Sequence, residues 1–175
     1  MSPTSTLMNT PLADRLVFSR IGIENLAVIT LLKEHRDDLS RHSPADSVHA
    51  FTPDAFLDPS VTLITSWDGD SLVGCGALKQ HSNLDKPLGE LKSMRTVDRY
   101  LRQGAAAAML EELMRLAEQY KITHLALETG SNEAFAPARA LYTRYGFTEC
   151  DPFADYQLDP YSTFMSIELP SHTFS

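Results

Sequence analysis

The chain of 175 residues has few cysteines, no excess of basic residues and no long apolar run. Its two cysteines, Cys75 and Cys150, stand far apart and in no Cys-x-x-Cys pattern, which excludes a disulfide framework and a zinc site of that kind. The 15 basic residues are outnumbered by 23 acidic ones, and the net charge of −8 argues against nucleic acid or an anionic membrane as a partner. No stretch approaches the roughly 20 apolar residues of a membrane span, and the first residues lack the pattern of a secretion signal, so we expect a cytoplasmic protein.

A metal ion is also not expected. His35, His42 and His49 recur every seven residues, but Pro44 interrupts the helical register and no pattern of carboxylates completes a set of ligands. The other candidates, His81 and His124, are expected at the surface or in structural contacts.

Length and composition predict one domain with a real core. At 43% hydrophobic residues, a chain of this length buries roughly 70% of its unfolded surface. We find no repeat or linker, and only the start is rich in Ser, Thr and Pro. We therefore expect a flexible segment over residues 1–13 and a single domain over residues 14–170.

The spacing of apolar residues predicts a mixed α/β fold with at least one strand–helix–strand crossover. Within the strand expected at 88–97, alternation places Glu90, Lys92, Met94 and Thr96 on one face. The expected order is a strand at 15–23, a helix at 24–41, a hairpin of strands at 61–67 and 71–78, a strand at 88–97, a helix from about 104 to 120, a strand at 123–129, a helix at 134–145 and a strand at 162–169.

The start of the central helix combines small residues with nearby positive charge. Four alanines follow Gly104, and four basic residues gather within eleven positions: Lys92, Arg95, Arg99 and Arg102. Small side chains at a helix start leave free backbone N–H groups open to an anion such as phosphate. The alternative is that the alanines are only good helix formers and the basic residues a solvated face.

Two motifs bracket the crossover. The first is Gly104-Ala105-Ala106 at the helix start, and the second is "ARALYTRYGF", with Ala138, Leu141, Tyr142, Gly146 and Phe147 at its defining positions. The segment from Leu88 to Phe147 that holds both motifs resembles the GCN5-related N-acetyltransferase (GNAT) family, including its small bacterial members. The resemblance implies the GNAT acyl-CoA N-acyltransferase fold, a central mixed and mostly antiparallel sheet flanked by helices.

The resemblance also implies that acetyl-CoA is the cosubstrate. In the family, the backbone of the fourth strand pairs with the pantetheine arm and the following helix start holds the pyrophosphate. Leu101 stands where the family prefers Arg or Gln, so contacts from Arg102 and Gln103 are expected instead. Phe135 stands where the family commonly has Asn, so a contact from Asn132 is expected in its place. The cofactor contacts that the resemblance implies are Met94, Arg95, Thr96, Arg102, Gln103, Gly104, Ala105, Ala106, Ala107 and Asn132.

Two residues match catalytic positions of the family. Glu90 lies where many members carry a glutamate that accepts the proton of the amine, and its alternative is an ion pair, for example with Lys92. Tyr142 lies where the family places the tyrosine that protonates the departing thiolate, and its alternative is a core tyrosine on an apolar stripe. The amine of a small molecule or peptide is expected to attack the thioester directly, without an acyl-enzyme.

Contacts to the acceptor are expected from Ser47 and His49, with Asp46 beside them, because family members bind substrate after the first helix. The acidic segment "DPFADYQLDP" either closes over a cationic substrate or is an ordinary polar loop. The resemblance allows a homodimer as well. Two other readings remain: a non-catalytic module that binds acyl-CoA, and a nucleotide enzyme, for which the Gly-x-Gly-x-x-Gly and Gly-Lys-Ser/Thr motifs are missing.

Overall fold

A seven-stranded sheet forms the centre of the computed structural model, in which residues 10–44, 52–82 and 86–170 are described. The strands lie in the order β1-β2-β3-β4-β5-β7-β6, and every neighbouring pair is antiparallel except β4 and β5. The mixed, mostly antiparallel sheet expected from the sequence is therefore confirmed. The strands are β1 (Val17–Ser19), β2 (Val61–Asp68), β3 (Ser71–His81), β4 (Leu88–Thr96), β5 (His124–Gly130), β6 (Thr148–Glu149) and β7 (Ser162–Glu168).

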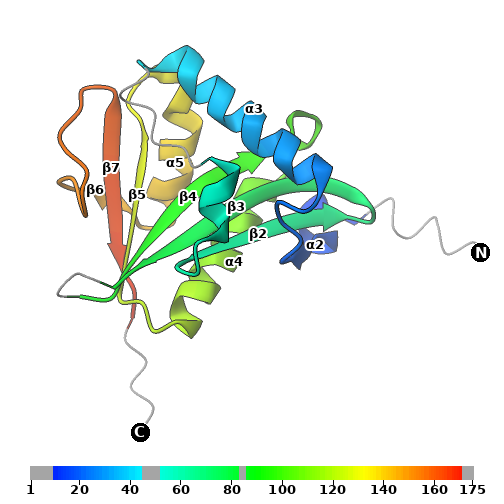
Figure 1. The fold of residues 1–175 in the computed structure, drawn as a ribbon, viewed down its shortest axis with the longest axis horizontal. Coiled ribbons are helices and arrows are strands. Elements are labelled where there is room, and N and C mark those ends of the chain that lie inside the picture. The colour runs from blue at the N-terminus through cyan, green and yellow to red at the C-terminus, as the bar shows by residue number, and fades with distance from the viewer. Residues whose placement is uncertain (1–9, 45–51, 83–85, 171–175) are drawn as a thin grey trace, which may run out of the picture.

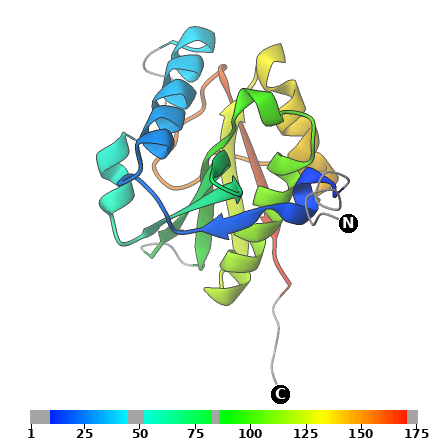
Figure 2. The ribbon, with the colours of Figure 1, turned by 90° about the vertical axis from the view of Figure 1, so that its right-hand side faces the viewer.

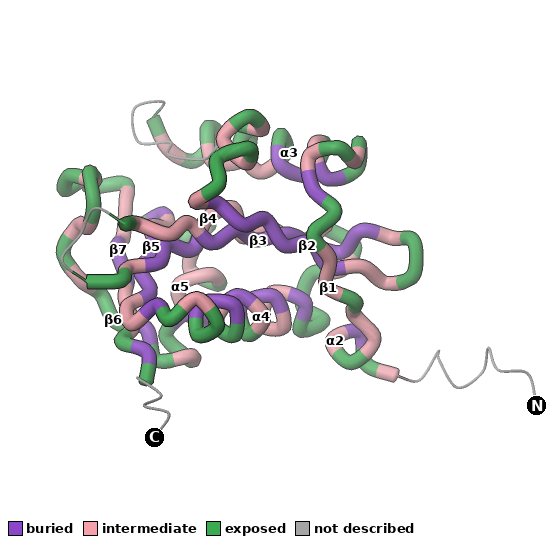
Figure 3. The backbone as a smooth tube through the Cα atoms, turned by 60° about the horizontal axis from the view of Figure 1, so that its bottom comes forward, coloured by how far each residue is buried: buried purple, intermediate pink, exposed green. Residues whose placement is uncertain are grey.

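Helices cover both faces of this sheet. On one face lie α3 (Leu26–His42) and the short 3-10 helix η2 (Pro53–Leu57), and on the other lie α4 (Ala105–Gln119) and α5 (Ala136–Arg144), with α2 (Leu12–Arg15) beside α4 (Figures 1 and 2). Two further 3-10 turns, η3 (Asp98–Tyr100) and η4 (Glu133–Phe135), precede α4 and α5. Figure 3 shows the buried strands β3 and β4 between the two helical layers.

Each layer has its own apolar core. The helical spacing of α4 buries Met109, Leu110, Leu113 and Ala117 against the sheet, whereas Tyr120 is only partly buried. On the opposite face, α3 begins where the Asn25 side chain accepts hydrogen bonds from the N–H groups of residues 27 and 28. Its buried residues then pack on those of β2 and β3: Val28, Leu31, Leu32, Leu63, Leu72, Cys75 and Ala77.

A bulge in β4 changes the face to which its side chains point. Lys92 pairs with Ala77 and Arg95 pairs with Cys75, so that one extra residue of β4 fits between the two pairs. The backbone accommodates the extra residue at Ser93, which has a positive φ of 55°. The Cys75 thiol donates a hydrogen bond to the Ser93 carbonyl oxygen over 3.3 Å.

The bulge overturns the alternation expected for this strand. Because opposite partners in a sheet share a face, Lys92 and Arg95 point to the α3 side. Met94 packs instead with the core under α4, and Thr96, opposite Gly74, lies on that side too. A regular alternation across residues 90–96 was thus the wrong prediction.

The chain start also differs from expectation. Leu12, within the segment expected to be flexible, lies in α2 and is buried with Val73 and Ala105. The hairpin of β2 and β3, the crossover through α4 and the end of α5 before Gly146, at a φ of 97°, agree with the sequence predictions. Within residues 10–44, 52–82 and 86–170, no helix combines the length and apolar character needed to cross a membrane.

Candidate active site

A cavity opens where β4 and β5 diverge. The two strands pair only from Leu88 to Leu91 on β4, and beyond that point they spread apart (Figure 1). The cavity of about 130 Å³ suits the reacting end of a ligand rather than a whole ligand. Its lining includes His35 and Leu39 of α3 on one face and Ala138 and Tyr142 of α5 on the other. The cavity therefore passes through the sheet.

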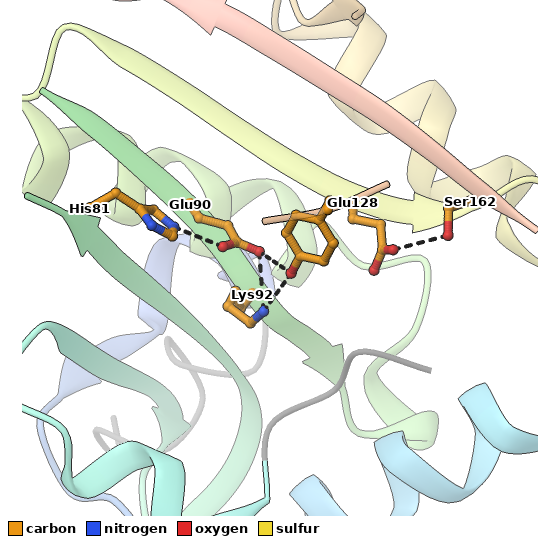
Figure 4. A network of polar contacts seen from close by, with 6 residues as sticks. His81, Glu90, Lys92, Glu128 and Ser162 are labelled. Atoms are coloured by element: carbon orange, nitrogen blue, oxygen red, sulfur yellow. Dashed lines mark hydrogen bonds and ion pairs between the residues drawn. The ribbon is translucent and has the colours of Figure 1, made fainter. Parts of the chain in front are cut away.

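Glu90 is the buried acid of this cavity. Only 2% of the residue is exposed, and its carboxylate accepts hydrogen bonds from three groups (Figure 4). His81 Nε2 lies 2.9 Å from Oε1, while the Tyr156 hydroxyl donates to Oε2 over 2.6 Å and Lys92 Nζ over 3.1 Å. The ion pair with Lys92, one of the two roles expected for Glu90, is therefore present.

The charge of Glu90 is held by these donors. Burial alone raises the pKa of a carboxyl group, but the hydrogen bond from His81, the positive charge of Lys92 and the hydrogen bond from Tyr156 together lower the pKa of Glu90 below its ordinary value. Glu90 is consequently an anion at neutral pH. A carboxylate offers about four acceptor positions, so its three donors leave room for one more partner.

Tyr156 brings the loop after β6 to the same point. Its hydroxyl contacts Glu90 and also accepts a hydrogen bond from Lys92 over 2.8 Å, and its ring packs against Phe153 and Phe164. Burial, followed by the negative charge of Glu90, raises the pKa of Tyr156, so the phenol stays protonated and remains a donor. A second carboxylate, Glu128 of β5, lines the same cavity and accepts a hydrogen bond from Ser162 over 2.9 Å.

Tyr142 approaches the cavity from α5. The residue is 6% exposed, and its ring meets Phe147 edge-on at 5.8 Å between centroids. Burial raises the pKa of the Tyr142 phenol to about 12, so the hydroxyl is neutral and able to donate. It is both a core residue and a wall of the cavity.

A second cavity of about 500 Å³ lies on the other side of Glu90. It is lined by the ends of β3 and β4 and by the loop residues 154–159. Glu90, Lys92 and Tyr156 line both cavities, whereas His81 lines only the second. Glu90 thus stands between a narrow passage through the sheet and a larger cavity beside it.

The start of α4 fits an anion. Gly104, at a φ of 84°, precedes the helix, and the first backbone bond of this start runs from Ala108 N–H to the Gly104 carbonyl. The N–H groups of residues 105–107 therefore have no partner within the helix. Ala105 is buried, but Ala106 and Ala107 are partly exposed, so their small side chains leave the N–H groups accessible.

The polar side chains expected to contact the cofactor do not all lie near the start of α4. Arg102, at a φ of 60°, and Gln103 are exposed before α4. The Arg95 side chain instead forms an ion pair with Asp38 on the α3 face, turned away from α4. Asn132 caps η4 by accepting from Ala134 N–H, and its amide donates to the His42 carbonyl over 2.8 Å. Of the ten cofactor residues expected, Met94 alone lines the first cavity.

The expected acceptor contacts Asp46, Ser47 and His49 lie outside the described residues. Three side chains of the site were not singled out from the sequence: His81, Glu128 and Tyr156. The His81 side chain is 15% exposed and contacts Glu90, which agrees with the second of the two expectations for it, a structural contact. A signal for Tyr156 was present in the acidic, aromatic segment 151–160, which lines the first cavity through Tyr156 and the second through residues 154–159. No group of three or more metal-ligating side chains occurs in the described parts of the chain.

Comparisons with known proteins place this geometry in context. The profile of the Acetyltransferase (GNAT) family matches residues 28–147. The uncharacterised N-acetyltransferase YsnE of Bacillus subtilis (strain 168) is 44% identical over 142 residues, covering 81% of this chain and 92% of that protein. YedL of Escherichia coli (strain K12), also an uncharacterised N-acetyltransferase, is 42% identical over 143 residues, covering 82% and 88%.

A solved structure shares the fold. It is a GNAT family acetyltransferase from Elizabethkingia anophelis with acetyl-CoA bound, which is 18% identical and superposes with a TM-score of 0.64. The match covers 89% of this chain and 99% of that one. At this identity the likeness concerns the fold.

Proposed function

Because the chain belongs to the GNAT family of acetyltransferases, we propose that it transfers the acetyl group of acetyl-CoA directly to the amine of a small molecule or peptide. The observation that carries the proposal is the passage between β4 and β5, which has the Glu90 carboxylate on one face of the sheet and the Tyr142 hydroxyl on the other. The proposal includes a cytoplasmic location, no nucleic-acid partner and a homodimer as the assembly to test.

The cosubstrate has two places to bind. The N–H groups of residues 105–107 would hold the pyrophosphate, helped by the positive end of the helix dipole and by the exposed Arg102. The pantetheine arm would follow β4 from Lys92 to Thr96, where that strand no longer pairs with β5. Its thioester end would then reach the narrow passage.

Glu90 prepares the acceptor. A side-chain amine with a pKa near about 10.4 is mostly protonated at neutral pH, so it must lose a proton before it attacks. The anionic Glu90 attracts the ammonium group to its remaining acceptor position and takes up that proton. The neutral nitrogen then attacks the thioester carbon held beside it.

Tyr142 stabilises the leaving group. As the carbon–sulfur bond breaks, negative charge collects on sulfur, and a neutral phenol donates a hydrogen bond or its proton to it. A thiol with an ordinary pKa near about 8.5 is a tolerable leaving group, so this assistance is modest. Neither cysteine offers a covalent route, because burial raises the pKa of Cys75 to about 12 and Cys150 has no histidine beside it in the sequence.

Thermal unfolding with acetyl-CoA, against ATP and NAD as controls, tests the binding step. A ligand at about 100 times its dissociation constant stabilises the folded state by about 2.7 kcal/mol, which raises the midpoint by a few degrees. A rise specific to acetyl-CoA is expected, followed by release of free thiol when a suitable amine is added. The absence of any rise at millimolar acetyl-CoA would overturn the proposal.

A further inference from the structure

The second cavity contains a histidine that the proposed reaction does not use. His81 ends β3, and its Nε2 lies 2.9 Å from Glu90 Oε1. His81 lines the second cavity but not the first, whereas Glu90 lines both. The contact between these two side chains is therefore a hydrogen-bonded path from the passage through the sheet to the larger cavity.

The reaction has a proton to export. An acceptor that starts as an ammonium ion loses two protons when it becomes an amide. One of them ends on the thiol of coenzyme A and the other must reach solvent. Glu90 is buried and its pKa is lowered, so a proton placed on it has to leave before the next turnover.

The other partners of Glu90 are unsuited to carry this proton. A charged lysine side chain has no lone pair to accept it, and the single Tyr156 oxygen, which donates to Glu90 and accepts from Lys92, has no second site from which to release a proton. An imidazole can accept a proton on one nitrogen and release one from the other. His81 has such a ring, and it faces the second cavity.

The geometry points to His81 as the relay that carries the acceptor's proton from Glu90 to water in the second cavity, an inference that rests on the proposed function. The amine N–H bond breaks, the electron pair stays on nitrogen, and the proton moves to the Glu90 carboxylate. Because His81 Nε2–H donates to the resting carboxylate, the ring first exchanges its proton with water from Nε2 to Nδ1 once Glu90 is protonated. The Glu90 proton then passes to the free Nε2, and the imidazolium ion releases its Nδ1 proton to water, which restores the resting donor.

The titratable and charged groups around His81 come from three elements. Among the described residues lining the second cavity they are Lys79 of β3, Glu90 and Lys92 of β4, and Asp155, Tyr156 and Asp159 of the loop. Of these groups, only the His81 imidazole offers one nitrogen that accepts a proton and a second that releases one.

The variant His81→Gln tests the relay. Its side-chain amide keeps an N–H donor for Glu90 but cannot pass a proton. Wild type, His81→Gln and the control His124→Gln, whose ring contacts Thr123 instead, are compared by thiol release from acetyl-CoA with the best acceptor among spermidine, lysine, glucosamine and glycylglycine. For His81→Gln we expect kcat to fall at least about tenfold and to recover with added imidazole. The KM for acetyl-CoA and the His124→Gln variant stay as in wild type.

The outcomes separate the relay from the proposed function. If wild type turns over and kcat is unchanged in His81→Gln, the relay alone is overturned. A lower kcat that added imidazole does not restore also overturns it, because it assigns His81 a structural contact. No turnover by wild type with any of the four amines overturns the proposed function, and the relay with it. If His81→Gln does not fold, His81→Asn takes its place with the same readouts.

Discussion

Lys92 and Arg95 stand three positions apart on β4, yet their side chains lie on the same face of the sheet. The bulge at Ser93 places two residues, Ser93 and Met94, opposite the single Gly76. The bulge keeps Lys92 and Arg95 on the α3 side, while Met94 packs with the core under α4. One strand thereby supplies both walls of the passage.

Substitution of Ser93 tests the strain in this bulge. At a φ of 55°, a β-branched side chain clashes with the backbone, so Ser93→Val is expected to lower the free energy of unfolding by about 1–2 kcal/mol in urea titrations. Ser93→Gly should be tolerated. Ser166→Val on β7 is the matched control and should not destabilise. Equal stability of both valine variants would contradict the assignment.

Lys92→Met tests the buried ion pair. Removing the cation leaves Glu90 charged at 3% side-chain exposure, and the expected loss is about 3–5 kcal/mol of unfolding free energy. The double variant Glu90→Gln with Lys92→Met should recover most of that loss, because no unpaired charge remains. A double variant as unstable as the single one would show that packing of the Lys92 stem, not charge, is what matters.

Ala107→Glu separates helix stability from ligand binding. A carboxylate in the first turn of α4 favours the helix by about 0.3–1 kcal/mol, but it repels a phosphate bound there. We expect an unchanged or higher unfolding midpoint together with an acetyl-CoA affinity at least about tenfold weaker in calorimetry. Glu118→Gln, near the other end of the helix, is the control. Undiminished affinity would place the pyrophosphate elsewhere.

Tyr142→Phe tests the proton donor. The ring and its edge contact with Phe147 remain, so the unfolding midpoint and acetyl-CoA binding should change little. The kcat for thiol release should fall at least about tenfold, because the charge on sulfur loses its donor. Tyr145→Phe, which removes a hydroxyl bonded to Glu111, serves as the control. A kcat equal to that of wild type would leave Tyr142 as a core residue only.

His35 predicts a loss of stability in mild acid. Burial, and then the positive charge of Arg95, lower its pKa from 6.5 to about 4, against the opposing effect of Asp38. Between pH 4 and 6.5 the unfolded chain binds more protons than the folded one, because His35 stays neutral in the folded protein. The folded state is therefore most stable with respect to this group above pH 6.5, and it loses stability as the pH falls toward 4. His35→Gln should flatten the pH dependence of the unfolding midpoint in that window, whereas Glu34→Gln, at an exposed position, should not.

The sequence predicted the elements better than their side-chain directions. Helical spacing located α4, and Gly146 marked the end of α5, because both signals are local. The bulge at Ser93 carries no local signal, since it arises from the pairing of β4 with β3. For the same reason the contacts of Glu90 with Tyr156, 66 positions away, could not be read from spacing.

The Cys75 thiol, which donates to the Ser93 carbonyl, gives the protein a built-in reporter. Burial raises its pKa to about 12, so the native protein should expose only Cys150 to a thiol reagent. Labelling of Cys75 then requires the strands around the bulge to separate, and the rate of this labelling measures how often they do so. The opening of the active-site sheet can thus be timed by counting modified sulfurs with mass spectrometry.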